Sequence, residues 1–85
     1  MNRINPKEFG LYAGTVLEQV DEHTVALVMD RKSRIIMADG RKIVEKVEKI
    51  HKVRPEVTVI LKTSAPVCSK TVAFLQKGGI TIHSF

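Results

Sequence analysis

The feature of this sequence that most constrains its fold is the succession of segments in its last third. A short apolar run, VTVILK (57–62), is followed by an amphipathic stretch and then by a second run, ITIHSF (80–85). Short apolar runs bounded by turn residues predict buried strands. Two neighbouring strands joined through a helix are parallel, with a right-handed crossover. The sequence therefore predicts a β-α-β unit and an α/β fold.

The helix of this unit is predicted to begin within KTSAPVCSKT (62–71). Ser64 is a residue type preferred at helix N-caps, and Pro66 is tolerated in a first turn. Gly78 and the glycine after it are a strong C-terminal stop. The apolar stripe of the predicted helix consists of Val67, Cys68, Val72, Phe74 and Leu75.

The first half of the chain predicts strands. TVLEQV (15–20) and TVALVMD (24–30) flank a short polar gap, which is typical of a hairpin. RIIMADG (34–40) follows another polar gap and predicts a third strand, which completes an antiparallel meander. Residues 1–9 are polar, contain a proline, and are expected to form a loose arm.

A first helix is predicted over 41–53, where apolar residues recur at helical spacing before Pro55. The predicted order is β-β-β-α-β-α-β: a mixed five-stranded sheet with two helices packed mainly on one face. The 85 residues contain no linker or repeat, so we expect one small α/β domain over 1–85.

The net charge of +5 is concentrated in the middle of the chain. Residues 31–54 hold nine basic and three acidic side chains, a net +6, and such a segment favours an anionic partner. A nucleic-acid patch would consist of Arg31, Lys32, Arg34, Lys42, Lys46 and Lys49. Aromatic residues make up only 5% of the chain, with no Trp, so platforms for base stacking are scarce. A solvated helix face is the commoner explanation of such a patch.

A single cysteine excludes an internal disulfide and any CxxC site, and it predicts a reducing, cytoplasmic setting. The N-terminus lacks a signal-peptide pattern. No run approaches the ~20 apolar residues that span a membrane, so we expect no membrane association. His23, His51 and His83 are scattered over different predicted elements, so neither a metal site nor a cofactor is expected.

Polar side chains follow two of the predicted strands. In open α/β sheets, ligands bind beyond the carboxyl ends of the strands, where helix N-termini add positive partial charge. The candidate ligand-binding edge therefore consists of Asp39, Gly40, Arg41, Thr63, Ser64 and Cys68. The alternative is that Asp39 and Ser64 only cap helices and that the nearby lysines are solvated.

Cys68 permits two interpretations. In the first turn of a helix, near Lys62 and Lys70, its pKa would be lowered and its thiolate would be nucleophilic. It also shares a stripe with Val72 and Leu75, where a free cysteine acts as a small buried hydrophobe.

The stretch TVILKTSAPVCSKTVAFLQKGGI (58–80) resembles the first strand, active-site turn and first helix of glutaredoxin-type thiol oxidoreductases. The matching positions are Lys62, Ala65-Pro66-Val67-Cys68, Phe74-Leu75 and Gly79-Ile80. The resemblance implies thiol chemistry, but Ala65 stands where the family has its nucleophilic cysteine. Cys68 matches only the second, resolving cysteine, which by itself does not perform dithiol exchange. The glutathione-binding cis-proline segment of the family would lie after Phe85.

The leading hypothesis is a non-enzymatic cytoplasmic domain that binds an anionic ligand or a protein partner at this strand edge. The same hypothesis allows a homodimer. The first alternative is a single-thiol redox protein that uses Cys68. The second is a nucleic-acid-binding module that uses the 31–54 segment. Nothing in the sequence forms a recognisable pair of catalytic acid and base.

Overall fold

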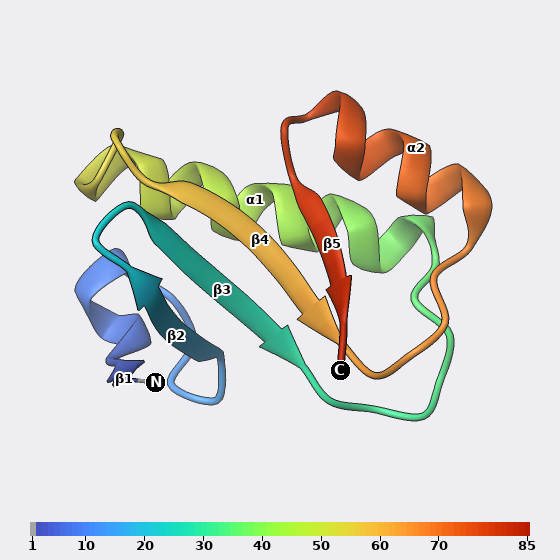
Figure 1. The fold of residues 1–85 in the computed structure, drawn as a ribbon, viewed down its shortest axis with the longest axis horizontal. Helices are drawn as coiled ribbons and strands as arrows, with labels where there is room; N and C mark the ends of the chain where they lie inside the picture. Colours follow the sequence, from blue (N-terminus) through green and yellow to red (C-terminus); the bar gives the residue numbers. More distant parts are fainter. Residues whose placement is uncertain (1) are drawn as a thin grey trace.

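The computed structural model describes residues 2–85 and contains one mixed sheet of five strands and two α-helices (Figure 1). The elements in chain order are β1 (Asn2–Ile4), the 3-10 helix η1 (Pro6–Phe9), β2 (Val16–Asp21), β3 (Thr24–Met29), α1 (Met37–Val53), β4 (Thr58–Thr63), α2 (Ser69–Lys77) and β5 (Thr81–Ser84). The predicted α/β class, the mixed five-stranded sheet and the order β-β-β-α-β-α-β are confirmed.

The strands lie in the sheet in the order in which they occur in the chain. β1, β2 and β3 form an antiparallel meander, whereas β3, β4 and β5 are parallel. The two crossovers through α1 and α2 advance in the same direction, so right-handed connections place both helices on one face (Figure 1). η1 contacts α1 on that same side. Among residues 2–85, no helix lies on the opposite face of the sheet.

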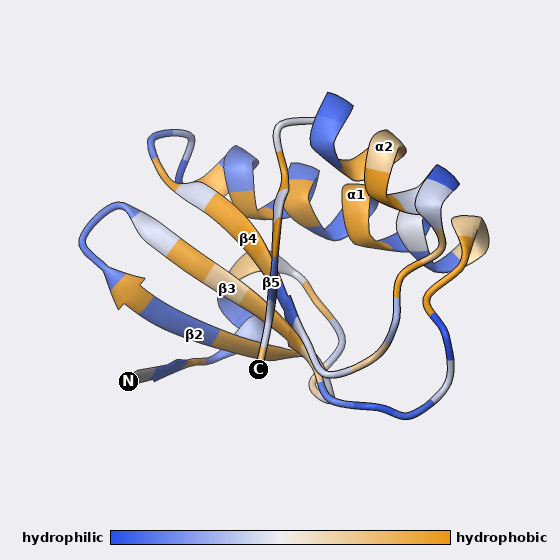
Figure 2. Cartoon of the chain, turned by 45° about the vertical axis from the view of Figure 1, so that its right-hand side comes forward, coloured by the Kyte–Doolittle hydropathy of each residue, from blue (hydrophilic) through white to orange (hydrophobic). Residues whose placement is uncertain are grey.

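The core lies between the sheet and these helices. Alternate residues of the strands point toward the helices, because successive side chains of a strand point to opposite faces. Along α1 the buried residues recur at helical spacing, and Figure 2 shows hydrophobic and hydrophilic turns alternating along both helices. The most deeply buried large apolar side chains are Leu17, Val25, Leu27, Ile35, Ile43, Ile50, Leu61 and Leu75.

The prediction of a strand at 34–40 is wrong. Only Ile35 takes part in strand pairing, through an isolated parallel bridge to Val67, and α1 already begins at Met37. The place beside β3 is taken by β4 instead. A short apolar run is compatible with either a strand or a helix start, and here its first residue pairs as a strand whereas Met37 and Ala38 begin the helix.

The N-terminal residues were expected to form a loose arm, but the described part of this segment is ordered structure. β1 pairs with β2, and Arg3 lies opposite Glu18. Asn5 caps η1 with its side chain, and Pro6 occupies the first helical position, where its missing N–H costs nothing. Phe9 is buried in the core and anchors the segment. The polar composition of this segment therefore did not predict its capped 3-10 turn or the burial of Phe9.

Gly40 lies inside α1, where this helix packs against Thr71 and Phe74 of α2. A Cβ atom at Gly40 would lie 2.9 Å from Cγ2 of Thr71 and 3.4 Å from the ring of Phe74. The residue was interpreted as a strand end, but its small size allows two helices to pack against each other. Its role in the fold is therefore steric.

We expect Gly40→Ala to lower the free energy of unfolding by about 1 kcal/mol. Overpacking against Thr71 costs more than the helix propensity of alanine contributes. Urea unfolding followed by circular dichroism measures the change. Thr71→Ser removes the methyl group that the new Cβ would contact, so the alanine should cost less in that background. A Gly40→Ala protein as stable as the parent would contradict this packing.

Candidate functional site

Two loop segments lie side by side at the carboxyl end of the parallel strands. Residues 30–36 connect β3 to α1, and residues 64–68 connect β4 to α2. The Ile35 N–H donates to the Pro66 carbonyl at 2.9 Å, and the Cys68 N–H donates to the Ile35 carbonyl at 3.0 Å. This pairing aligns the N-termini of the two helices at one edge of the sheet.

Asp39 caps the N-terminus of α1. Its Oδ2 accepts from the Ile36 N–H at 3.0 Å and from Arg31 Nη2 at 2.6 Å. The hydrogen bond from Arg31 and then that from Ile36 lower the pKa of the Asp39 carboxyl. Arg31 also donates to the Arg34 carbonyl at 3.1 Å. The carboxylate therefore fixes the loop to the helix, as the capping alternative expects.

The hydroxyls at the end of β4 have partners within the protein. Thr63 is buried, and its hydroxyl donates to the Met29 carbonyl at 2.7 Å and accepts from the Ala65 N–H at 3.0 Å. Ser64 donates to Asp30 Oδ1 at 2.7 Å. These bonds hold the end of β4 against the end of β3, so Thr63 and Ser64 do lie at the predicted edge.

Two further predicted members of the edge, Gly40 and Arg41, lie within α1. Gly40 is buried between the helices, and Arg41 is exposed on α1. They do not follow a strand, because α1 begins before them. Their selection depended on the strand predicted at 34–40.

Cys68 is the N-cap residue of α2, a position that the sequence suggested for Ser64. Its side chain is half-buried, whereas the buried residues of α2 are Thr71 and Leu75. The N–H groups of Lys70 and Thr71 lower the pKa of the Cys68 thiol, and partial desolvation opposes them. The cysteine therefore lies at the exposed end of the helix and outside its buried stripe.

The basic residues of the 31–54 segment are divided between a loop and a helix. Arg31 is engaged with Asp39, while Lys32 and Arg34 are exposed on the β3–α1 loop. On α1, Lys42 and Lys49 are exposed and Lys46 is half-buried. Whether they bind nucleic acid stays a prediction.

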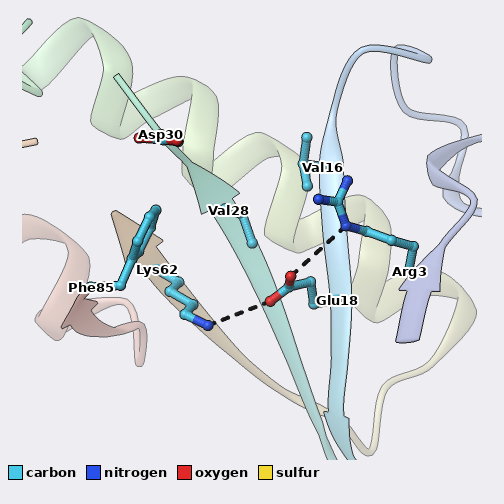
Figure 3. A pocket seen from close by; sticks show the side chains of 7 residues that line it. All are labelled: Arg3, Val16, Glu18, Val28, Asp30, Lys62 and Phe85. Atoms are coloured by element: carbon cyan, nitrogen blue, oxygen red, sulfur yellow. Dashed lines mark ion pairs between the residues drawn. The ribbon is translucent and has the colours of Figure 1, made fainter. Parts of the chain in front are cut away.

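A hollow that the sequence did not predict lies on the sheet face without helices. Its volume is about 480 Å³, and it lies at the carboxyl ends of β3 and β4 (Figure 3). Its lining residues are Arg3, Val16, Glu18, Val28, Asp30, Lys62 and Phe85.

Glu18 lies between two basic residues on one side of this hollow (Figure 3). Its Oε2 is 3.8 Å from Arg3 Nε, and its Oε1 is 3.6 Å from Lys62 Nζ. Lys62 Nζ also lies 5.7 Å from the centre of the Phe85 ring, within the range of a cation–π contact. The charged groups thus form a row across β1, β2 and β4.

No protein-family model matches this chain, and no curated protein or solved structure matches it significantly. In the part of the chain that the structure describes, no three His, Cys, Asp or Glu side chains are grouped so as to hold a metal ion. No helix among residues 2–85 has the length and hydrophobicity to cross a membrane.

We expect Asp39→Asn to destabilise the fold by about 1 kcal/mol at neutral pH, a typical effect of losing a helix-capping carboxylate. The folded-state pKa of Asp39 lies below its unfolded value, so its contribution is present at neutral pH. It is lost as the pH falls from about 4 through the folded-state pKa. Urea unfolding at neutral and acidic pH should show the variant and the parent converging. Glu45→Gln, on the exposed face of α1, is the control. A difference that persists in acid would contradict the charge-based explanation.

Proposed function

We propose that this chain is a non-enzymatic binding domain whose ligand is a small anion with an apolar or aromatic body. The ligand occupies the hollow at the carboxyl ends of the parallel strands. The observation that carries the proposal is the hollow itself, because its volume of about 480 Å³ falls within the range typical of small-molecule sites. Its position also follows the general rule that α/β sheets bind ligands at this end.

The charges of the lining side chains sum to zero, but the exposed guanidinium of Arg3 favours an anionic ligand. Both carboxylates already have partners: Glu18 is paired with Arg3 and Lys62, and Asp30 accepts from Ser64. The Arg3 side chain is 70% exposed, and its contact with Glu18 is long and made through Nε. Figure 3 shows its two terminal nitrogens turned away from Glu18. A guanidinium in this position offers N–H donors to a carboxylate or phosphate.

The apolar groups favour a ligand with a flat body. Val16 and Val28 line the hollow from neighbouring strands, and Phe85, at the edge of the hollow, is 56% exposed. An aromatic ring of the ligand would cover this exposed ring in a stacked or edge-to-face arrangement. The single cysteine is consistent with a cytoplasmic ligand.

The proposal is tested by titrating the ¹⁵N-labelled protein with phenyl phosphate, benzoate and inorganic phosphate. We expect saturable amide shifts for the aromatic anions at residues 16–18, 28–30 and 60–63, and weaker binding of inorganic phosphate. Arg3→Gln and Phe85→Ala should each weaken phenyl phosphate binding about fivefold or more, which corresponds to the loss of one good contact. Lys7→Gln, on exposed η1, is the matched control for charge.

Silence of these amides across the three probes would overturn the proposal. So would binding that is the same in Arg3→Gln and Phe85→Ala as in the parent. Shifts of the same residues that depend on protein concentration, without added ligand, would assign this face to a second copy of the chain instead.

A further inference from the structure

The charged side chains that line the hollow are separated into two groups. Glu18 forms ion pairs with both Arg3 and Lys62, so these three side chains carry a net charge of +1. Asp30 is the fourth charged residue of the lining and carries a negative charge. Figure 3 shows Asp30 on the opposite side of the hollow from Arg3. The hollow is therefore neutral as a whole, but it has a positive side and a negative side.

The charge of the Asp30 carboxylate is not balanced by a cation of the protein. Its Oδ1 accepts from the Ser64 hydroxyl at 2.7 Å, which is a hydrogen bond to a neutral group. Among residues 2–85, Asp30 forms no ion pair, and the neighbouring Arg31 is paired with Asp39 instead. Because Asp30 is exposed, a cationic group of a ligand in the hollow can reach it. A bond from an ammonium group to this carboxylate would be charge-assisted.

The register of the sheet keeps Arg3 and Asp30 apart. Arg3 lies opposite Glu18, and Glu18 lies opposite Ala26 of β3. Asp30 is four residues further along the chain than Ala26. With about 4.8 Å between strands and about 3.3 Å per residue, the backbones of Arg3 and Asp30 are roughly 16 Å apart. A ligand that contacts both side chains must carry its charges at opposite ends of its body.

The surface between these two charges is apolar. Val16 and Val28 lie opposite each other in register and both line the hollow. Figure 3 shows the two valines between Arg3 and Asp30, with the Phe85 ring on the side of Asp30. An aromatic ring over the valines would therefore have one end directed toward the guanidinium and the other toward the carboxylate.

We propose that the ligand of the hollow is a zwitterion, an aromatic carboxylate or phosphate that carries an amine at its opposite end. The anion binds to Arg3, the ammonium group binds to Asp30, and the ring packs on the two valines. Lys62 does not oppose this orientation, because its ammonium group is directed toward Glu18 and away from Asp30 (Figure 3). The inference rests on the proposed function, since it requires the hollow to be the binding site.

The first experiment compares 4-(aminomethyl)benzoate with 4-methylbenzoate, which has the same shape and carboxylate but lacks the amine. Each is titrated into the ¹⁵N-labelled protein at neutral pH, and the amide shifts of residues 16–18 and 28–30 give the affinity. We expect the zwitterion to bind about threefold to fivefold more tightly, the effect of one added ion pair that is partly exposed. Phenylalanine, whose two charges are at the same end, should bind more weakly than 4-(aminomethyl)benzoate. Equal binding of phenylalanine would contradict the opposite-end arrangement.

The second experiment removes the charge of Asp30. Asp30→Asn keeps an oxygen that accepts from Ser64, so the end of β3 should stay in place. In this variant the two benzoates should bind with equal affinity, and the affinity for 4-methylbenzoate should not fall. Glu22→Gln, on the exposed turn between β2 and β3, is the matched control and should preserve the preference for the zwitterion. A preference that survives in Asp30→Asn would overturn the assignment of this carboxylate.

The outcomes separate this inference from the proposed function. If both benzoates bind to the parent protein with equal affinity, the hollow is a site for aromatic anions and the zwitterion is wrong. If neither benzoate shifts these amides, the proposed function fails and the inference fails with it. Arg3→Gln should weaken both benzoates by the same factor, because it removes a contact with the carboxylate that they share. A loss confined to the zwitterion in this variant would contradict the proposed orientation.

Discussion

The backbone pairing between the two strand–helix connections organises one end of the molecule. Ile35 is fully buried, and both its N–H and its carbonyl bond to the 64–68 connection. A buried backbone polar group without a partner is costly, so this pairing holds the connections in one register. With the register fixed, α1 and α2 begin side by side, and Gly40 meets Thr71. The same register places Cys68 at the N-terminus of α2.

The sequence predicted the fold class because the β-α-β pattern and the central hairpin depend on local composition. It misassigned 34–40 because the identity of the third meander strand depends on which segment reaches the sheet edge. Ile35 does have strand-like pairing, but Asp39 starts the helix by binding back to the Ile36 N–H. Gly40 was interpreted as a breaker because its close approach to α2 is a tertiary contact. No local signal distinguishes a glycine that ends an element from one that lets two helices touch.

The candidate sites were predictable to different degrees for the same reason. Thr63 is the last residue of β4 and Ser64 follows it, so the rule for strand ends placed both at this edge of the sheet. Asp30 also follows a strand, but with a strand predicted at 34–40 the same rule selected Asp39 instead. The ion pairs of Glu18 could not be predicted without the order of the strands in the sheet. Glu18 and Lys62 are in β2 and β4, and they meet only because β3 lies between them with small side chains on that face.

The ion pairs of Glu18 also shield the sheet face that no helix covers. Ala26 is on that face, yet it is 0% exposed, and its neighbours in register are Glu18 and Ile60. The paired side chains of Glu18 and Lys62 cover the middle of the face and exclude water from the strand beneath. Further along β3 the row continues with Val28, which lies between Val16 and Lys62. The hollow begins there because the short side chains of Val16 and Val28 leave space that longer side chains would fill. A ligand bound in the hollow would cover this part of the sheet face, as the Glu18–Lys62 pair covers the part around Ala26.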